Sequence, residues 1–175
     1  MPHRVFLAIP ISLSLQNEVT TWERNFQNLP VRWLKGKNLH ITLIPPWETN
    51  DIVNIVTLLN GLKSSVGKIE LQFTSVTFGP NPREPRLILA EGETMNQLSE
   101  IRSQLYETLK FPPESRFFKL HLTLARFRPE NFSTFPMQTL NETVDWHDTA
   151  TSFVLMESHL LPTGAEYKIL SSYPL

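Results

Sequence analysis

The sequence contains no cysteine, so disulfides, thiolate metal ligands and cysteine nucleophiles are excluded. Its six glycines form neither a phosphate-binding loop of the Walker type nor a dinucleotide-binding fingerprint. Neither sign of charge dominates, because 16 Lys and Arg side chains oppose 17 Asp and Glu side chains. A net charge of −1 provides no overall basic field for long duplex nucleic acid. A polyanionic partner must therefore be small or bind a local basic patch.

Long hydrophobic runs are also missing, since no segment approaches the ~20 apolar residues of a membrane-spanning helix. The apolar stretch over 5–15 loosely resembles a signal peptide, but Pro10 interrupts it and no small-residue cleavage site follows. We therefore expect a cytoplasmic protein without membrane association. The hydrophobic fraction of 41% is enough for a core. The length favours a single two-lobed domain over residues 1–175.

One five-residue pattern, Leu-His-apolar-Thr-Leu, is present twice, at 39–43 and at 120–124. Side chains alternate between the two faces of a strand, so His40 and Thr42 share one face, as do His121 and Thr123. The leucines of each copy lie on the opposite, buried face. Two such strands laid side by side would place two imidazoles and two hydroxyls in one cleft.

A single copy of this pattern is typical of a half-buried strand whose His and Thr face solvent. Two copies with matching flanking residues favour a functional site instead. A third His-x-Thr, His147-Asp148-Thr149, lies in a polar run, and we interpret it as a loop.

The hydrophobic periodicity predicts strands interspersed with three helices. Helices are expected over 13–28, 50–64 and 93–110, the first capped by Ser12 or Ser14 and the last with Met95 facing inward. We expect Pro45-Pro46 to end the strand that carries the first motif. Strands are expected over 4–9, 31–34, 38–44, 69–78, 86–90, 119–127, 151–161 and 167–173, with an irregular stretch near 129–140.

The order strand, helix, motif strand is repeated along the chain. The first unit starts at Arg4, 36 residues before His40, and the second at Arg86, 35 residues before His121. Duplicated units that meet about a pseudo-twofold axis would place the two histidines across one central cleft.

Two histidines and two threonines are suited to acid–base chemistry at a phosphate. A neutral imidazole can accept a proton from water while an imidazolium protonates the leaving oxygen. The hydroxyls can donate to the non-bridging oxygens, where negative charge develops. A zinc site needs more ligands than two histidines, and a serine triad needs a nucleophile elbow and an orienting Asp, which are missing here. We therefore expect no metal and no cofactor.

In three stretches, two of which contain these motifs, the chain resembles proteins of the two-histidine phosphoesterase superfamily. Within it, the similarity is to RNA 2',3'-cyclic phosphodiesterases, also called 2'-5' RNA ligase-like proteins. The resemblance extends from Arg4 to Leu175. The matching stretches are Arg32-Trp33 with Asn38–Leu43, His121–Arg126, and Ser158-x-Leu160-x-Pro162-x-Gly164-x-x-Tyr167 with Pro174-Leu175.

The resemblance implies a bilobal α+β fold, with two antiparallel sheets facing a central cleft and helices outside. It implies hydrolysis of a terminal 2',3'-cyclic phosphate to a 2'-phosphomonoester, with His40 protonating O3' and His121 acting as the base. The residues themselves leave the order of the two histidines open. The family pattern after the first motif is apolar, Phe, apolar, Gly, whereas this chain has Ile44-Pro45-Pro46-Trp47, so the cleft rim differs.

Further residues are candidates for substrate contacts. Arg126 follows the second motif on the opposite face of a regular strand, and a β-bulge would turn it toward a phosphate in the cleft. Asn38 and Lys119 lie two residues before the motif histidines and share their faces. Trp33 and Trp47 are candidates for stacking on a base, and core packing is the alternative for both.

We interpret the chain as a monomeric, metal-independent enzyme without an obligate protein partner. Its expected partners are RNA ends or small nucleotides that carry a 2',3'-cyclic phosphate. The alternatives are a 2'-5' RNA ligase or 2'-5' oligonucleotide phosphodiesterase, and a non-catalytic module that binds RNA ends.

Overall fold

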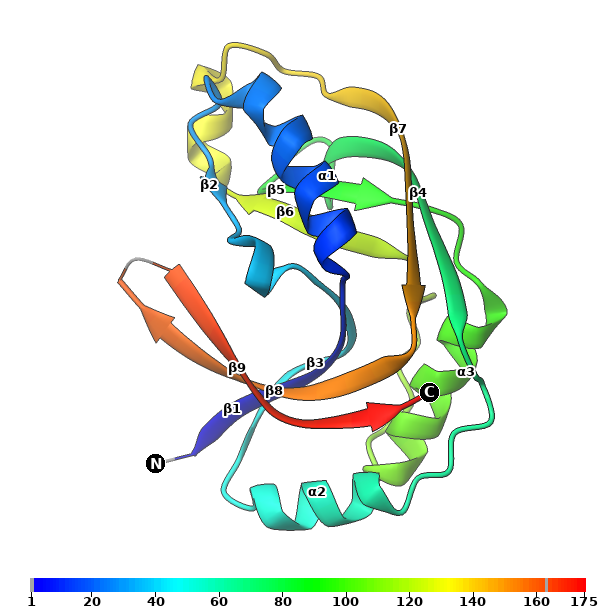
Figure 1. Cartoon of the computed structure of the whole chain (residues 1–175). Coiled ribbons are helices and arrows are strands. Elements are labelled where there is room, and N and C mark those ends of the chain that lie inside the picture. Colours follow the sequence, from blue (N-terminus) through cyan, green and yellow to red (C-terminus); the bar gives the residue numbers. More distant parts are fainter. Residues whose placement is uncertain (1, 163) are drawn as a thin grey trace.

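Two antiparallel sheets form the body of the protein, with helices on their outer sides (Figure 1). The computed structural model describes residues 2–162 and 164–175. The first sheet has the strand order β3-β1-β8-β9 and the second β2-β6-β5-β4-β7. This arrangement confirms the expected bilobal α+β fold. The strands are β1 (His3–Pro10), β2 (Arg32–Trp33), β3 (His40–Thr49), β4 (Ile69–Gly79), β5 (Leu87–Glu91), β6 (His121–Arg126), β7 (Asn141–Ala150), β8 (Ser152–Leu161) and β9 (Gly164–Pro174).

Three α-helices cover the sheets. Helix α1 packs against β7, α2 against β9, and α3 against both β3 and α2. The Ser12 side chain caps α1 by accepting a hydrogen bond from the backbone N–H of Leu15, as expected. No helix among the described residues has the length and apolar character needed to cross a bilayer. The helices are α1 (Leu13–Glu23), α2 (Ile52–Asn60) and α3 (Asn96–Thr108), with 3₁₀ turns η1 (Arg24–Phe26), η2 (Gly36–Asn38) and η3 (Pro129–Thr134).

The core explains why both motif strands take their positions. The apolar residues of each motif are completely buried, whereas the His and Thr between them are only partly buried. The alternation predicted for the two motifs is therefore confirmed. Fully buried members of this core come from both sheets and include Leu7, Ile41, Phe73, Leu122 and Leu155.

The two motif strands are related by the internal repeat, down to their register. Strand β3 pairs with β1 so that His40 lies opposite Pro10, and β6 pairs with β5 so that His121 lies opposite Glu91. Each pair contains a β-bulge at the same place. Leu43 is the extra residue in β3, and Leu124 is the extra residue in β6.

Some expectations about the elements are wrong. The run interpreted as a loop around His147 is strand β7, in which Val144, Trp146, Asp148 and Ala150 alternate toward the interior. Strand β3 continues through Pro45 and Pro46 to Thr49. Successive N–H positions point to opposite sides of a strand, so one of the two prolines faces the open edge of the sheet. The other falls where the register with β1 is irregular, between Ile44 and Trp47.

The predicted helices are longer than the observed ones. The first ends in the 3₁₀ turn η1, and the second and third are shorter at both ends. Met95 does not face inward, because it precedes the first turn of α3 and is 38% exposed.

Candidate active site

His40 begins strand β3, and its ring is held by the backbone just before it. Its Nδ1 lies 2.7 Å from the carbonyl oxygen of Asn38. A carbonyl oxygen only accepts hydrogen bonds, so Nδ1 carries the proton and Nε2 remains available for proton transfer. Phe6 and Tyr167 flank the imidazole, with ring centroids 5.0 and 5.2 Å from that of His40. These contacts fix both the tautomer and the orientation of the ring.

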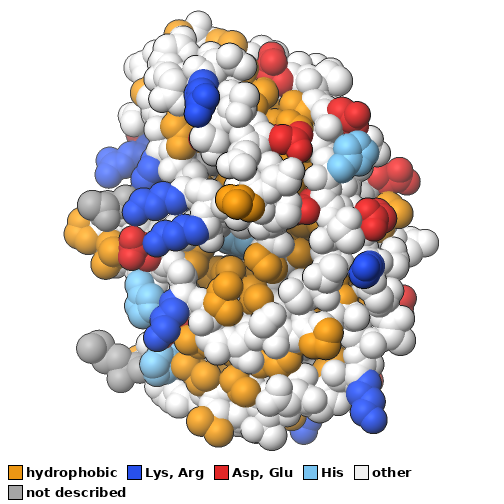
Figure 2. Space-filling model, in the orientation of Figure 1, with side chains coloured by type: hydrophobic (Ala, Val, Ile, Leu, Met, Phe, Trp, Pro, Cys, Tyr) orange, Lys and Arg blue, Asp and Glu red, His pale blue; other side chains and the backbone are white. Residues whose placement is uncertain are grey.

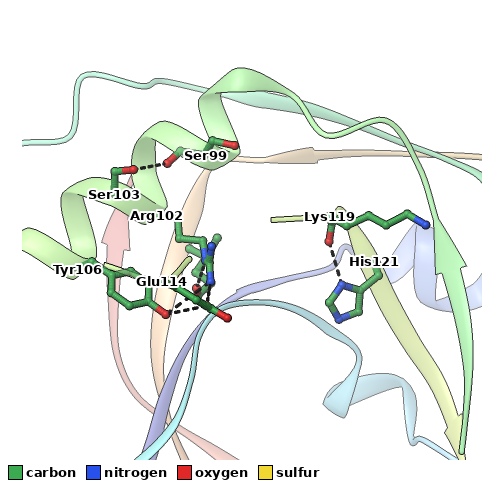
Figure 3. Close-up of polar contacts among 8 residues, drawn as sticks. Ser99, Arg102, Ser103, Tyr106, Glu114, Lys119 and His121 are labelled. Carbon is green, nitrogen blue, oxygen red and sulfur yellow. Dashed lines mark hydrogen bonds and ion pairs between the residues drawn. The ribbon is translucent and has the colours of Figure 1, made fainter. Parts of the chain in front are cut away.

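His121 begins strand β6 and has the same arrangement. Its Nδ1 lies 2.9 Å from the carbonyl oxygen of Lys119, and Figure 3 shows the ring turned toward that carbonyl. Its Nε2 is therefore also the nitrogen available for proton transfer. Strands β3 and β6 come into contact, although they belong to different sheets.

The bulge in β6 changes the direction of Arg126. Leu124 and Ala125 are both fully buried, so the alternation shifts by one residue and Arg126 lies on the same side as Thr123. The structure thus contains the bulge that the sequence analysis required for Arg126 to face the cleft. Arg126 lines a cavity together with His40 and Thr42.

This cavity, which we call the His40 cavity, has a volume of about 370 Å³. Its polar side chains are mainly cationic or can donate hydrogen bonds, which suits an anionic group. His121 and Thr123 are not among the residues that line it. The lining residues are Arg4, Phe6, Arg32, His40, Thr42, Pro46, Arg126, Ser158, Leu160, Leu161, Gly164, Ala165 and Tyr167.

Burial and nearby positive charge keep the His40 imidazole neutral. The pKa of His40 is lowered from 6.5 to about 4. Desolvation is the largest cause, and the charges of Arg126 and His121 act in the same direction, whereas the hydrogen bond to the Asn38 carbonyl acts in the opposite direction. In the free protein at neutral pH, His40 is therefore an unprotonated imidazole with a free Nε2. An anion bound beside it would stabilise the imidazolium and raise its pKa.

The β8–β9 hairpin is tied to the segment that precedes His40. The Asn38 side chain is buried, and its Nδ2 donates to the carbonyl oxygen of Ala165 at 3.1 Å. Lys35 forms an ion pair with Glu166 at 3.4 Å. Figure 2 shows several Lys and Arg side chains along the edge of the molecule where the hairpin lies in Figure 1. Asn38, predicted to contact substrate, thus positions His40 through its backbone and fastens the hairpin through its side chain.

Three other predicted contact residues do not line the His40 cavity. Trp47 packs edge-on against Phe111, with ring centroids 5.2 Å apart, a contact that favours the alternative of core packing. Trp33 lines a neighbouring cavity of about 60 Å³ and packs against Trp22. The Lys119 ammonium forms an ion pair with Glu91 at 2.8 Å, and its carbonyl oxygen accepts the hydrogen bond from His121.

Several cavity residues were not singled out from the sequence. Arg4 and Phe6 alternate on β1 with the core residues Val5 and Leu7, so they belong to the second face of this strand, which lines the cavity. The period-two pattern of Arg4, Phe6 and Ala8 was the available signal. Arg32 and Tyr167 were noted only as parts of the family resemblance, and both line the cavity.

Comparison with known proteins decides the family. The model of the 2'-5' RNA ligase superfamily matches residues 11–160, which include both motifs. The chain belongs to this superfamily. It is 26% identical over 173 residues to the RNA 2',3'-cyclic phosphodiesterase of Archaeoglobus fulgidus, with 95% of this chain and 97% of that protein covered.

Solved structures agree on the fold of this superfamily member. E. coli LigT complexed with 3'-AMP superposes with a TM-score of 0.80 at 19% identity, covering 100% of this chain and 99% of LigT. The TT0787 protein of Thermus thermophilus gives a TM-score of 0.71 at 21% identity, covering 98% of this chain and 97% of that chain.

Within residues 2–162 and 164–175, no group of three or more His, Cys, Asp or Glu side chains is arranged to hold a metal ion.

Proposed function

We propose that this chain is a phosphodiesterase that opens terminal 2',3'-cyclic phosphates of RNA ends or small nucleotides to 2'-phosphomonoesters. The observation that carries the proposal is the shared arrangement of His40 and His121. Each donates its Nδ1 proton to the carbonyl two residues earlier and leaves Nε2 free. The superfamily membership and the name of the Archaeoglobus fulgidus relative support the same reaction.

In the proposed reaction, one unprotonated Nε2 takes a proton from water as the water oxygen forms a bond to phosphorus. The bond between phosphorus and O3' breaks, and O3' receives the proton of the other imidazolium. Thr42 and Thr123 donate hydrogen bonds to the non-bridging oxygens, and Arg126 neutralises the negative charge. The product keeps the phosphate on O2'.

The free protein and the resemblance favour different assignments of the two histidines. A neutral His40 is ready to act as a base, whereas the resemblance implies that it is the acid. An acid role requires that the bound phosphate anion raise the pKa of His40 from about 4. A measurement of the pKa of His40 in the presence of inorganic phosphate separates the two assignments.

The test is turnover of a 2',3'-cyclic mononucleotide in the presence of excess chelator, followed by ³¹P NMR. We expect quantitative formation of the 2'-phosphate. Absence of turnover, formation of the 3'-phosphate, or dependence on an added divalent ion would contradict the proposal.

A second candidate is favoured by the superfamily description, which names 2'-5' RNA ligation. The same ring opening with a 5'-hydroxyl in place of water forms a bond between O5' and phosphorus, breaks the bond between phosphorus and O3', and gives a 2'-5' linkage. Incubation of a cyclic-phosphate oligonucleotide with a 5'-hydroxyl oligonucleotide would show a ligated product if this reaction competes with hydrolysis.

A further inference from the structure

The β-bulges of β3 and β6 differ in the group that donates a hydrogen bond to the carbonyl oxygen of the extra residue. In β6 the carbonyl oxygen of Leu124 accepts the backbone N–H of Leu34 at 2.8 Å, because β2 and its continuation lie beside β6. Strand β3 is at the edge of its sheet, and none of the described strands pairs with its outer side. There the carbonyl oxygen of Leu43 accepts the side-chain Nε–H of Arg102 at 2.9 Å. Arg102 of α3 thus donates to the β3 bulge the hydrogen bond that Leu34 donates to the β6 bulge.

The guanidinium of Arg102 is held by an ion pair and by two aromatic rings, in addition to its hydrogen bond to Leu43. The side chain is 13% exposed, and its Nη2 forms an ion pair with Glu114. Its central carbon lies 5.2 Å from the ring centroid of Tyr106 and 5.1 Å from that of Phe118. The Tyr106 hydroxyl donates to the same carboxylate at 3.0 Å. A planar, charged group held by ion pair and aromatic faces has little freedom, so it fixes the carbonyl that it contacts.

These contacts also reach the second motif. Glu114 and Phe118 belong to the segment that connects α3 to β6, and this segment leads directly to Lys119 and His121. Figure 3 shows the Arg102 cluster and the His121 ring in one view. One side chain thus connects the bulge that follows Thr42 with the segment that precedes His121.

We propose that Arg102 is a positioning residue for the reaction proposed above: it holds the β3 bulge so that His40 and Thr42 keep the geometry that β2 secures for His121 and Thr123 in the other half. This inference rests on the proposed function. Arg102 is not among the residues that line the His40 cavity, so its loss acts through the placement of other side chains. A displacement on the ångström scale far from the reacting atoms is sufficient to cost about 10²-fold in rate.

The test compares three variants on a 2',3'-cyclic mononucleotide. Arg102→Met keeps the aliphatic stem and removes the donor, and we expect it to lower kcat about 10- to 100-fold with KM within about threefold. Arg102→Lys retains a cationic donor without the planar stack, and we expect an intermediate kcat. Arg116→Met is the matched control, since Arg116 is an exposed arginine that lines the same surface cavity as Arg102. Its kcat should equal that of the wild type.

A second readout does not require turnover. In ¹H–¹⁵N NMR spectra, Arg102→Met should shift the amide signals of Ile41 to Ile44 and speed their hydrogen exchange, while Arg116→Met should leave them unchanged. If Arg102→Met does not fold, Glu114→Gln takes its place, because it loosens the guanidinium without removing it and should give a smaller change of the same kind.

An unchanged kcat in a folded Arg102→Met protein, an equal loss in the control, or a loss confined to KM would overturn the positioning role. Failure of the proposed function gives a different result. In that case the wild type itself does not turn over the cyclic phosphate, while the NMR comparison still reports on whether Arg102 holds β3.

Discussion

Pro45 and Arg126 occupy equivalent places in the two motif strands, each directly after the buried pair that contains the bulge. In the second half this place provides a guanidinium that lines the His40 cavity. In the first half it provides a proline, which has no charge and no N–H. Both halves of the internal repeat therefore have the histidine and the threonine, but only the second half has an arginine at this position. Burial is the main cause of the lowered pKa of His40, and the Arg126 guanidinium, which lines the same cavity, lowers it as well.

Replacing either motif histidine by alanine should abolish most activity. A general acid or base contributes about 10²–10⁴-fold, so we expect losses of that size for His40→Ala and for His121→Ala. Both side chains are only partly buried, so both variants should remain folded. Steady-state rates together with circular dichroism test this, and near-normal turnover by either variant would refute the two-histidine mechanism.

Replacing the motif threonines should lower the rate without moving its pH dependence. Thr42→Ala and Thr123→Ala each remove one hydrogen-bond donor to the transition state, which costs about 10²–10³-fold in kcat. Threonine does not titrate in the accessible range, so the profile should keep its shape. A shifted profile would instead mean that the hydroxyls position the imidazoles.

The pKa of His40 should respond to Arg126 and to bound anion in the directions that charge dictates. Histidine NMR titration of the free protein should place His40 far below the ordinary value of 6.5, near the expected value of about 4. Removing the guanidinium in Arg126→Met should raise this pKa, because a repelling positive charge is lost.

Adding inorganic phosphate to the wild type should also raise the pKa of His40. A rise to near neutrality would support the acid role for His40, whereas a small rise would support the base role. No response to either change would show that Arg126 and the phosphate site lie away from His40.

The depressed pKa of His40 should make the fold less stable in mild acid. The unfolded chain binds a proton at His40 near pH 6.5, and the folded protein does not until about pH 4. The contribution of His40 to the free energy of unfolding is therefore complete above pH 6.5 and declines as the pH falls toward 4.

Urea unfolding at pH 7 and pH 5 measures this loss, and we expect a smaller loss in His40→Gln than in the wild type. Glu23 acts in the opposite sense, because burial raises its pKa to about 7, but it is present in both proteins and cancels in the comparison. Equal losses in His40→Gln and the wild type would contradict the low pKa of His40.

The sequence by itself determined the motif strands, because period two is a local property that needs no knowledge of neighbours. It also determined the repeat, since the two units have nearly equal spacing. It failed at β7, where Asp148 and His147 made an alternating strand look like a polar loop. It failed again at the prolines of β3, which are compatible with a strand because β3 lies at a sheet edge and its register with β1 is irregular at that point.

Only the tertiary structure decided which residues accompany the histidines. Trp47 and Lys119 share the local patterns of site residues, yet their side chains are engaged by Phe111 and Glu91, which are distant in the sequence. Arg102 has no motif at all, and its role follows from the absence of a strand beside β3 and the bulge carbonyl left there. Alternation is set by the chain's own geometry, whereas the partner of an exposed carbonyl or ammonium is set by elements that folding brings from elsewhere.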